Sequence, residues 1–309
     1  MHWNRQCKIK KLKLLRKVFI MSRALTDLIS LLTLEPSSEY TFVGEGSSGD
    51  GADATYGGHF LGQSISAALS GTNDTFQLHS MHGYFLRAGV PERSISYSVE
   101  TLREGQSFCT KRVSASQEGH KNFELLASFT KKEEKGFFHS IATRDLSQIP
   151  RPESIEPYNK IMAKLNPLPL PKEWALREHG IDVRVVNAPW VSSKLSENGG
   201  INMWIKAHGV APSNAKLHTA MLAYQSDESI ADNVLLPFNL TWGSPNLFFV
   251  SLDHALWIHA PINLNNWHFV EQEPVTIQNN RGLATAKVWS TDGLLVASFT
   301  QEVLMRQQN

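Results

Sequence analysis

The sequence predicts an α+β fold built from two copies of one unit, each a helix wrapped by a curved antiparallel sheet. In each half a helix of small and apolar residues precedes a run of strands separated by turn-forming residues. The halves also match literally: "HGYFLRAG" (82–89) resembles "HALWIHAP" (254–261), and "TKRVSASQEGHKNFELLASFT" (110–130) resembles "TAKVWSTDGLLVASFT" (285–300). A repeat of about half the chain indicates an internal duplication.

The composition excludes several classes of protein. The 309 residues suit one large domain or two ordinary ones, and 41% hydrophobic with 19% charged residues is typical of a globular protein. The net charge of +1 gives no field for nucleic acid, so we expect no nucleic-acid partner. Cys7 and Cys109 lie in no metal-binding pattern, so we expect neither a metal nor a cofactor. No apolar run approaches the roughly 20 residues of a membrane span, so we expect no integral membrane segment.

Residues 1–21 form a basic extension, with no acidic residue before Asp27. The favoured interpretation is a translated upstream extension with the true start at Met21. A transit peptide and a short membrane-surface helix are the alternatives. The C-terminal "RQQN" is not a Ser-Lys-Leu peroxisomal signal. We therefore expect a cytoplasmic location, or an organellar one if the extension is genuine.

Residues 22–133 are expected to form the first repeat. A short helix over 24–34, with Ser22 or Thr26 as N-cap, precedes a Gly/Ser/Asp-rich segment. A second helix follows over 59–71 and ends at Gly71. Alternating aromatic and β-branched residues then predict strands at 79–86, 94–102, 107–117 and 122–130.

Residues 134–190 are rich in proline and are expected to be a linker without regular structure. The second repeat is expected at 191–309, with a helix over 216–230. Its strands are predicted at 201–208, 248–261, 273–278, 282–290 and 294–305. We expect the two sheets to join edge to edge, because this removes exposed strand edges.

Two polar residues occupy positions where apolar ones are expected. Gln301 lies on the buried face of the last strand, and Asp227 lies on the apolar stripe of the second-repeat helix. An unpaired buried amide costs about 1–3 kcal/mol, so each needs a partner. The pattern leaves two interpretations open. Either both groups are satisfied structurally, with Asp227 partly exposed, or both converge on one water molecule and orient it for attack on a carbonyl.

Other polar groups compete for a catalytic role. Ser251, Asp253 and His254 suggest a serine triad, but adjacent residues of a strand point to opposite faces, and the chain contains no GxSxG motif. His82 and His254 occupy equivalent places in the repeats, which suits a structural hydrogen bond at least as well as chemistry. "GEGSSG" (44–49) matches GxGxxG but lacks the parallel strand of a dinucleotide site, so we interpret it as a loop.

The start of the first long helix is a further candidate site. Tyr56, Gly57 and Gly58 lead into it, and free backbone N–H groups at such a start can bind a carbonyl oxygen or a phosphate. Tight contact of the helix start beneath the sheet is an equally good interpretation.

Taken together, "YGGHFLGQ", "LHSMHGYFLRAG", "VETLREGQSF", "SLDHALWIH", "NLNNW" and "DGLLVASFTQEVLMR" resemble the type II acyl-CoA thioesterases. These TesB-like hydrolases have a double-hotdog fold. The resemblance spans the chain from about residue 22 to the C-terminus. It implies hydrolysis of fatty acyl-CoA to fatty acid and CoA without a covalent acyl-enzyme, with acyl-CoA as the partner and a homo-oligomer of double-hotdog units.

The resemblance also assigns roles. Asp227, Ser251 and Gln301 match the family's water-orienting residues, with Ser251 in place of the usual Thr. Gly57, Gly58, His82 and Arg281 are the substrate-binding candidates, and Lys287 and Arg87 are further candidates for the CoA phosphates. Two alternatives remain, a non-catalytic acyl-CoA-binding protein and a hotdog enoyl-CoA hydratase. The hydratase needs an Asp and a His facing the substrate together, which the alternation of Asp253 and His254 opposes.

Overall fold

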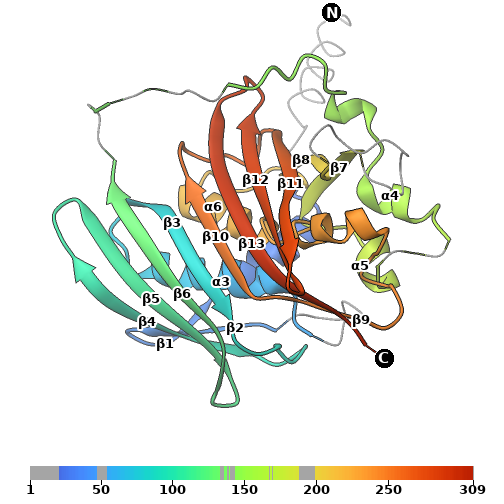
Figure 1. Ribbon diagram of the computed structural model, residues 1–309. Helices are drawn as coiled ribbons and strands as arrows, with labels where there is room; N and C mark the ends of the chain where they lie inside the picture. Colours follow the sequence, from blue (N-terminus) through green and yellow to red (C-terminus); the bar gives the residue numbers. More distant parts are fainter. Residues whose placement is uncertain are drawn as a thin grey trace, which may run out of the picture.

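The computed structural model describes residues 21–46, 54–132, 136–137, 139, 143–166, 168, 170–187 and 199–308. In this part of the chain thirteen strands form one continuous antiparallel sheet (Figure 1). The first half contributes β1 (Glu35–Ser38), β2 (Thr41–Gly44), β3 (Phe76–Phe85), β4 (Ile95–Glu104), β5 (Phe108–Gln117) and β6 (His120–Lys131). The second half contributes β7 (Ile181–Asn187), β8 (Asn202–Ala207), β9 (Leu247–Ser251), β10 (Asp253–Ile258), β11 (His268–Gln278), β12 (Arg281–Ser290) and β13 (Leu295–Gln307).

The two halves meet at the centre of the sheet. The strand order is β1-β2-β4-β5-β6-β3-β10-β13-β12-β11-β8-β7, with β9 paired to β13. The β3–β10 pair joins the halves, with His254 opposite Gly83 and Ala255 opposite His82. This confirms the predicted edge-to-edge union, which satisfies two strand edges that would otherwise expose backbone donors and acceptors.

Helices cover the inner face of the sheet. They are α2 (Arg23–Leu32), α3 (Gly57–Ser70) and α6 (Ala215–Gln225), with the shorter α4 (Tyr158–Met162) and α5 (Lys172–Leu176) at the side of the second half (Figure 1). Short 3-10 turns lie at Pro152–Ser154, Ala231–Val234 and Leu236–Phe238. Ser22 caps α2 by accepting a hydrogen bond from the Leu25 N–H at 3.0 Å, so the predicted Ser22 cap is confirmed.

Small residues let α3 and α6 approach closely. A Cβ at Gly58 would lie 2.3 Å from the carbonyl oxygen of Tyr224, and one at Gly62 would lie 3.2 Å from that of Ala220. Both helices are lined by buried apolar residues and share one core with the inner face of the sheet. The composition of small and apolar residues is therefore what places the start of α3 beside the end of α6.

Several predicted elements differ from the structure. The helix expected at 216–230 ends at Gln225, because Ser226 closes it and Ser229 has a positive φ of 63°. The strand expected at 248–261 is two strands, β9 and β10, separated at Leu252, whose N–H donates to Glu302 O. Gly71 has a φ of −101°, so α3 does not end in the left-handed conformation typical of a terminal glycine.

The proline-rich segment expected to be unstructured carries regular structure. It holds α4, α5 and the edge strand β7, which pairs with β8 from Ile181 to Asn187. Its earlier part crosses the outer face of the second-half sheet, where the Trp204 indole donates to Pro150 O at 3.0 Å. A second small core forms there around Trp204, Phe269 and Trp289.

Candidate active site

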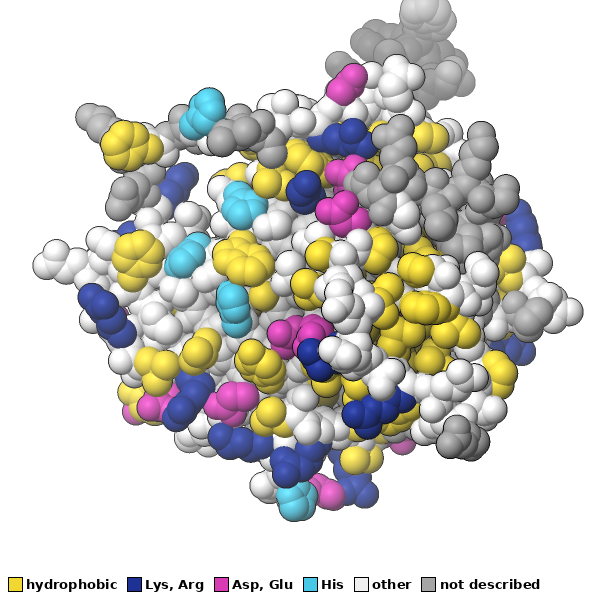
Figure 2. All heavy atoms as spheres, viewed as in Figure 1, with side chains coloured by type: hydrophobic (Ala, Val, Ile, Leu, Met, Phe, Trp, Pro, Cys, Tyr) yellow, Lys and Arg dark blue, Asp and Glu magenta, His cyan; other side chains and the backbone are white. Residues whose placement is uncertain are grey.

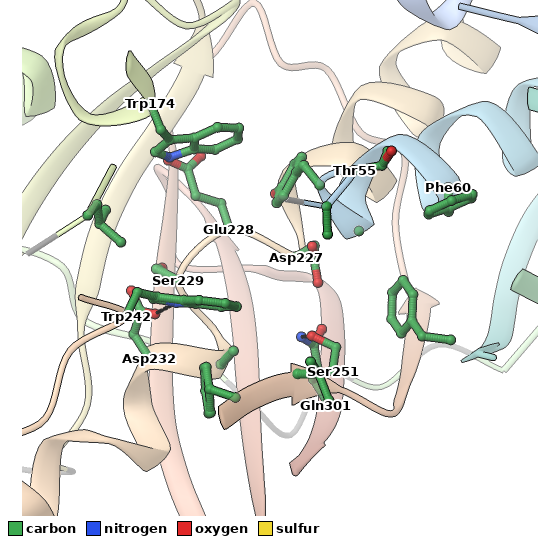
Figure 3. A pocket seen from close by; sticks show the side chains of 18 of the residues that line it. Thr55, Phe60, Trp174, Asp227, Glu228, Ser229, Asp232, Trp242, Ser251 and Gln301 are labelled. Atoms are coloured by element: carbon green, nitrogen blue, oxygen red, sulfur yellow. Dashed lines mark hydrogen bonds between the residues drawn. The ribbon is translucent and has the colours of Figure 1, made fainter. Parts of the chain in front are cut away.

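A cavity of about 570 Å³ lies where the start of α3, the end of α6, β9 and β13 come together (Figure 3). Its wall includes Gly57, Asp227, Ser251 and Gln301, which come from both halves of the chain. The structure therefore brings together four of the residues singled out in the sequence. Most of the remaining wall is apolar.

Asp227 belongs to the turn after α6 and not to the helix itself. Only 9% of the residue is exposed, and its Oδ1 has no hydrogen-bond partner among the described residues. Burial raises the pKa of Asp227 to about 6, while hydrogen bonds from the Gln301 side chain and the Gly58 N–H act in the opposite direction. A carboxylate with this pKa is suited to accept a proton near neutral pH.

Ser251 and Gln301 form one hydrogen-bonded pair at the cavity wall. Ser251 ends β9 and lies across from Val303 of β13, two residues beyond Gln301. The Gln301 Nε2 donates to Ser251 Oγ at 2.7 Å, and the amide is only 1% exposed. The burial of alternate residues of β13 from Ala297 to Val303 confirms the predicted inner face.

Behind Gln301 lies a pair of groups whose role the sequence did not reveal. The Nδ1 of His254 is 2.5 Å from Gln301 Oε1, and its Nε2 is 2.9 Å from Ser226 Oγ. Burial lowers the pKa of His254 to about 4, so the ring is neutral at pH 7. The register of β10 against β13 reveals this contact, and a single sequence does not contain that register.

The start of α3 contacts the carboxylate directly. A Cβ at Gly57 would lie 2.6 Å from Asp227 Oδ2, and the Gly58 N–H is one of the groups that lower the pKa of Asp227. Backbone N–H groups at a helix start favour a negative charge there. Gly57 and Gly58 thus hold the carboxylate in place, a contact that the sequence analysis did not assign to them.

The structure does not bring His82 and Arg281 to the cavity. His82 lies opposite Ala255 in the β3–β10 pair, so its side chain points to the face opposite His254, where its ring contacts Trp257 at 5.0 Å. The expected equivalence of His82 and His254 is therefore wrong. Arg281 is exposed at the start of β12 and pairs with Glu302 at 3.0 Å. Figure 2 shows histidine and hydrophobic side chains gathered over the middle of this outer face.

Asp253 and His254 likewise do not form a joint acid–base pair. Asp253 Oδ1 accepts a hydrogen bond from the Glu302 N–H at 2.9 Å, whereas His254 bonds to Gln301 and Ser226 on the inner side. Neither residue lines the cavity. The geometry that the hydratase alternative needs is therefore absent at this pair.

One arm of the cavity runs from the polar group toward β7 and β8. It is formed by apolar side chains of both strands, by the residue just before β8 and by aromatic residues of α4 and α5, namely Val183, Val185, Met203, Ile201, Tyr158 and Trp174. Glu228 and Asp232 also face the cavity; burial raises the pKa of both, that of Asp232 to about 7. From the sequence Glu228 was expected in a solvated patch, and this expectation is wrong because the carboxyl is buried. The apolar arm was not expected, because β7, α4 and α5 lie in the segment interpreted as a linker.

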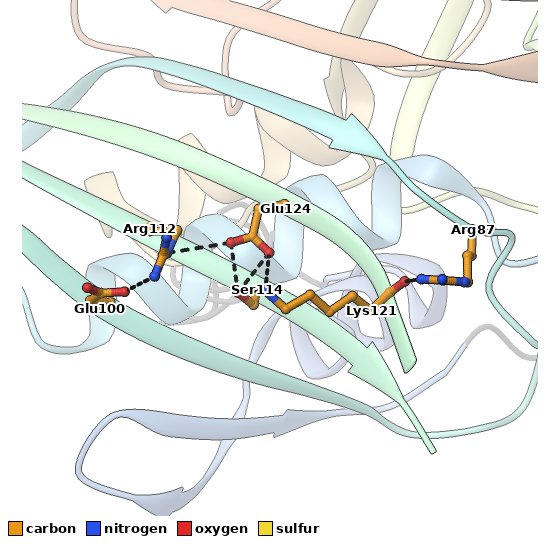
Figure 4. A network of polar contacts seen from close by, with 6 residues as sticks. All are labelled: Arg87, Glu100, Arg112, Ser114, Lys121 and Glu124. Carbon is orange, nitrogen blue, oxygen red and sulfur yellow. Dashed lines mark hydrogen bonds and ion pairs between the residues drawn. The ribbon is translucent and has the colours of Figure 1, made fainter. Parts of the chain in front are cut away.

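The opposite end of the cavity is formed by residues 85–89, at the end of β3 and just after it. Arg87 lies there and donates from Nη1 to Lys121 O at 3.0 Å (Figure 4). Its guanidinium makes no ion pair with a carboxylate in the described part of the chain. By contrast, the neighbouring Lys121 and Arg112 are both paired with Glu124, at 3.1 and 3.6 Å.

A long helix wrapped by an antiparallel sheet, repeated and joined edge to edge, is the double-hotdog fold. Comparisons with known proteins agree. A family model described as the acyl-CoA thioesterase C-terminal domain matches residues 162–305, and one described as the acyl-CoA thioesterase N-terminal domain matches residues 45–130.

Relatives cover nearly the whole chain. "Acyl-CoA thioesterase 2" of Haemophilus influenzae is 33% identical over 93% of this chain and 99% of its own length. "Acyl-coenzyme A thioesterase 8" of Homo sapiens is 31% identical over 90% and 88%. The crystal structure of acyl-CoA thioesterase II TesB2 from Mycobacterium marinum superimposes with a TM-score of 0.72, at 27% identity, covering 92% of this chain and 98% of that one.

The chain therefore belongs to the acyl-CoA thioesterase family and is a thioester hydrolase of type II. This confirms the resemblance and the fold expected from the sequence. No helix in the described part of the chain is both long enough and apolar enough to span a membrane.

Proposed function

We propose that the protein hydrolyses fatty acyl-CoA thioesters by direct attack of a water molecule that Asp227, Ser251 and Gln301 orient. The observation that supports this most is their convergence at one cavity, with Gln301 bonded to Ser251 at 2.7 Å and Asp227 beside the same amide. The unpartnered Oδ1 of Asp227 supplies an acceptor for the water proton.

The chemistry follows from the charges. The ionised Asp227 accepts a proton from the water, whose oxygen forms a bond to the thioester carbonyl carbon. The carbonyl becomes an oxyanion, and the backbone N–H of Gly57 at the start of α3 stabilises it. Collapse of this intermediate breaks the C–S bond, and the CoA thiolate leaves and takes up the proton that Asp227 accepted, which restores the carboxylate. A thiolate leaves readily, so no covalent intermediate is needed.

The cavity also has places for the two ends of the substrate. The apolar arm beside β7 and β8 suits an acyl chain, because burial of each CH₂ contributes about 0.8 kcal/mol. Arg87 at the opposite end suits a CoA phosphate, because its charge faces no carboxylate partner among the described residues. Among the basic residues named from the sequence, Arg87 is thus the one favoured by its position.

Thiol release from long- and medium-chain acyl-CoA, followed with a thiol reagent, tests the proposal. Asp227→Asn is expected to lower kcat by at least about 10³-fold, because the amide cannot accept the water proton. Asp292→Asn, in the exposed turn between β12 and β13, is the matched control and should leave kcat unchanged. Equal kcat for Asp227→Asn and wild type would refute the role of Asp227.

The cytoplasmic location and the homo-oligomeric state stay predictions. Sedimentation of the purified protein measures the second directly. Residues 1–20 lie outside the described part of the chain, so the origin of the basic extension also stays a prediction.

A further inference from the structure

Gln301 has two chemically different ends, and the proposed function needs one of them to face Asp227. If the amide were reversed, its oxygen would face the carboxylate, and two acceptors would lie side by side. The two ends have nearly the same shape, so packing alone does not select the orientation. Something must therefore distinguish the oxygen from the nitrogen by hydrogen bonding.

His254 is the group in contact with the far end of this amide. It lies on β10 beside Gln301 of β13, as the register of Ala255 against Thr300 requires. Its Nδ1 is 2.5 Å from Gln301 Oε1, and its ring stacks on Phe299 at 5.8 Å with planes 25° apart. With only 1% of the residue exposed, the imidazole has no solvent partner that could compete.

A neutral imidazole carries one N–H, so its two nitrogens must take opposite roles. Gln301 Oε1 can only accept, and this requires the proton on Nδ1. Nε2 is then an acceptor and needs a donor. The Ser226 hydroxyl is 2.9 Å from Nε2 and also 2.9 Å from Ala223 O, and it carries one proton. The Nδ1–H tautomer requires that this proton lie on the side of Nε2. Ser226 is 1% exposed and lies at the end of α6, one residue before Asp227.

We infer that His254, held by Ser226 in the Nδ1–H tautomer, is a positioning residue that fixes the Gln301 amide with its NH₂ group toward Ser251 and Asp227. The order of donation is Ser226 O–H to His254 Nε2, His254 Nδ1–H to Gln301 Oε1, and Gln301 Nε2–H to Ser251 Oγ. His254 does not itself line the cavity, so it acts only through Gln301. The inference rests on the proposed function.

Steady-state kinetics on His254→Phe and His254→Asn test this. Phenylalanine keeps a stacked ring but has no N–H for Gln301, whereas the Asn side-chain amide places an N–H where Nδ1 was. We expect kcat to fall about 10²-fold in His254→Phe, with KM within about twofold of wild type. His254→Asn should keep at least about a tenth of the wild-type kcat. His259→Phe removes a histidine–serine contact of 2.9 Å on the exposed face and is the control.

A double-mutant cycle separates positioning from a structural role. In a Gln301→Ala background, His254→Phe should cause no further loss of kcat, because the group it positions is gone. An equal further loss in both backgrounds would overturn the inference. So would a wild-type kcat in His254→Phe. If Gln301→Ala itself retains wild-type kcat, the proposed function fails instead, so the two failures are distinguishable.

A spectroscopic measurement keeps the inference testable if the His254→Phe variant does not fold. In ¹⁵N-histidine-labelled wild-type protein, the His254 signals, assigned by their loss in His254→Asn, should show a protonated Nδ1 and a bare Nε2 at pH 7. Ser226→Ala should shift these signals and lower kcat about tenfold. A protonated Nε2 in the wild type would overturn the inference.

Discussion

The backbone of Gly57 lies so close to Asp227 that a Cβ at position 57 would stand 2.6 Å from the Oδ2 of the carboxylate. The same Cβ would be 3.0 Å from Phe85. The first residue of α3 must therefore be glycine for the carboxylate to keep its place. A residue of one half of the chain thus determines the position of the acid in the other half.

Gly57→Ala is expected to lower kcat about 10²-fold, because the added methyl group displaces the carboxylate by about an ångström. Assays of thiol release with thermal melting check this. Gly71→Ala at the other end of α3 is the matched control, because its nearest neighbour would be Lys111 Nζ at 3.8 Å. An unchanged kcat in Gly57→Ala would contradict the proposed place of Asp227.

The pH dependence of kcat/KM should report the ionisation of Asp227. Only the ionised carboxylate can accept the water proton, and burial raises its pKa to about 6. We therefore expect kcat/KM to rise with pH through about 6 and then level off. A pH–rate profile between pH 4.5 and 8 measures this. A profile that is flat from pH 4.5 upward would argue against Asp227 as the base.

Asp227→Asn should make the protein more stable at pH 8 by up to about 3 kcal/mol. The sign follows from the raised pKa in the folded state. Burial disfavours the ionised acid but not the protonated acid. The free energy of unfolding of the wild type therefore falls as pH rises from about 4, the pKa of the group in the unfolded chain, through about 6, its pKa in the fold. Thermal melts should therefore coincide near pH 3.5 and separate at pH 8. Separation at low pH alone would contradict this account.

Ser251 should accept threonine but not alanine. Its hydroxyl accepts from Gln301 Nε2 at 2.7 Å, so Ser251→Ala leaves that N–H without its partner and should lower kcat about tenfold. Ser251→Thr keeps the hydroxyl and adds a methyl group that restricts χ1, so kcat should stay within about threefold of wild type. Steady-state kinetics on both variants test this prediction. Equal losses of kcat in the two variants would mean that the shape of the side chain matters here and its hydroxyl does not.

Arg87→Gln should raise the KM for acyl-CoA about five- to tenfold, with kcat nearly unchanged, because it removes the charge that we propose binds a phosphate of CoA. The effect should disappear with a thioester that lacks the nucleotide part of CoA. Arg112→Gln is the control, because Arg112 pairs with Glu100 and Glu124 on the outer face. A lower kcat at constant KM in Arg87→Gln would point to a role in the chemical step.

Val185→Phe should shift the preference toward shorter acyl chains. The side chain is 3% exposed and lines the apolar arm of the cavity, so a larger ring shortens the space for the chain. The ratio of kcat/KM for a 16-carbon to an 8-carbon acyl-CoA is expected to fall about tenfold. Val275→Phe, at a 54% exposed position of β11, should leave the ratio unchanged. An unchanged ratio in Val185→Phe would place the chain elsewhere.

Much of the fold was predictable because the signals are local. Alternation in β13 placed Gln301 on the inner face, and small residues in α3 indicated a helix buried against its neighbours. The end of α6 was not predictable in the same way. The apolar period continues past Gln225, but the chain leaves the helix through a turn in which the Glu228 N–H donates to Gln225 O and Ser229 has a positive φ.

The remaining part of the site depends on register. A sequence pattern compares His254 with Asp253, its neighbour along the chain, whereas the side chain that His254 contacts is Gln301 on the adjacent strand. Strand β7 was missed for a different reason. Its alternation from Ile181 to Val185 was present, but the surrounding prolines dominated the composition. The apolar arm that β7 helps to form was missed with it.

The β3–β10 pair, which joins the two halves, also limits how the protein could be divided. The helix start comes from the first half, while the acid, the hydroxyl and the amide come from the second. Either half produced alone would carry an incomplete set of groups. The two halves of the polypeptide are therefore not interchangeable, because two copies of the second half alone would lack the Gly57 helix start that lies beside the carboxylate.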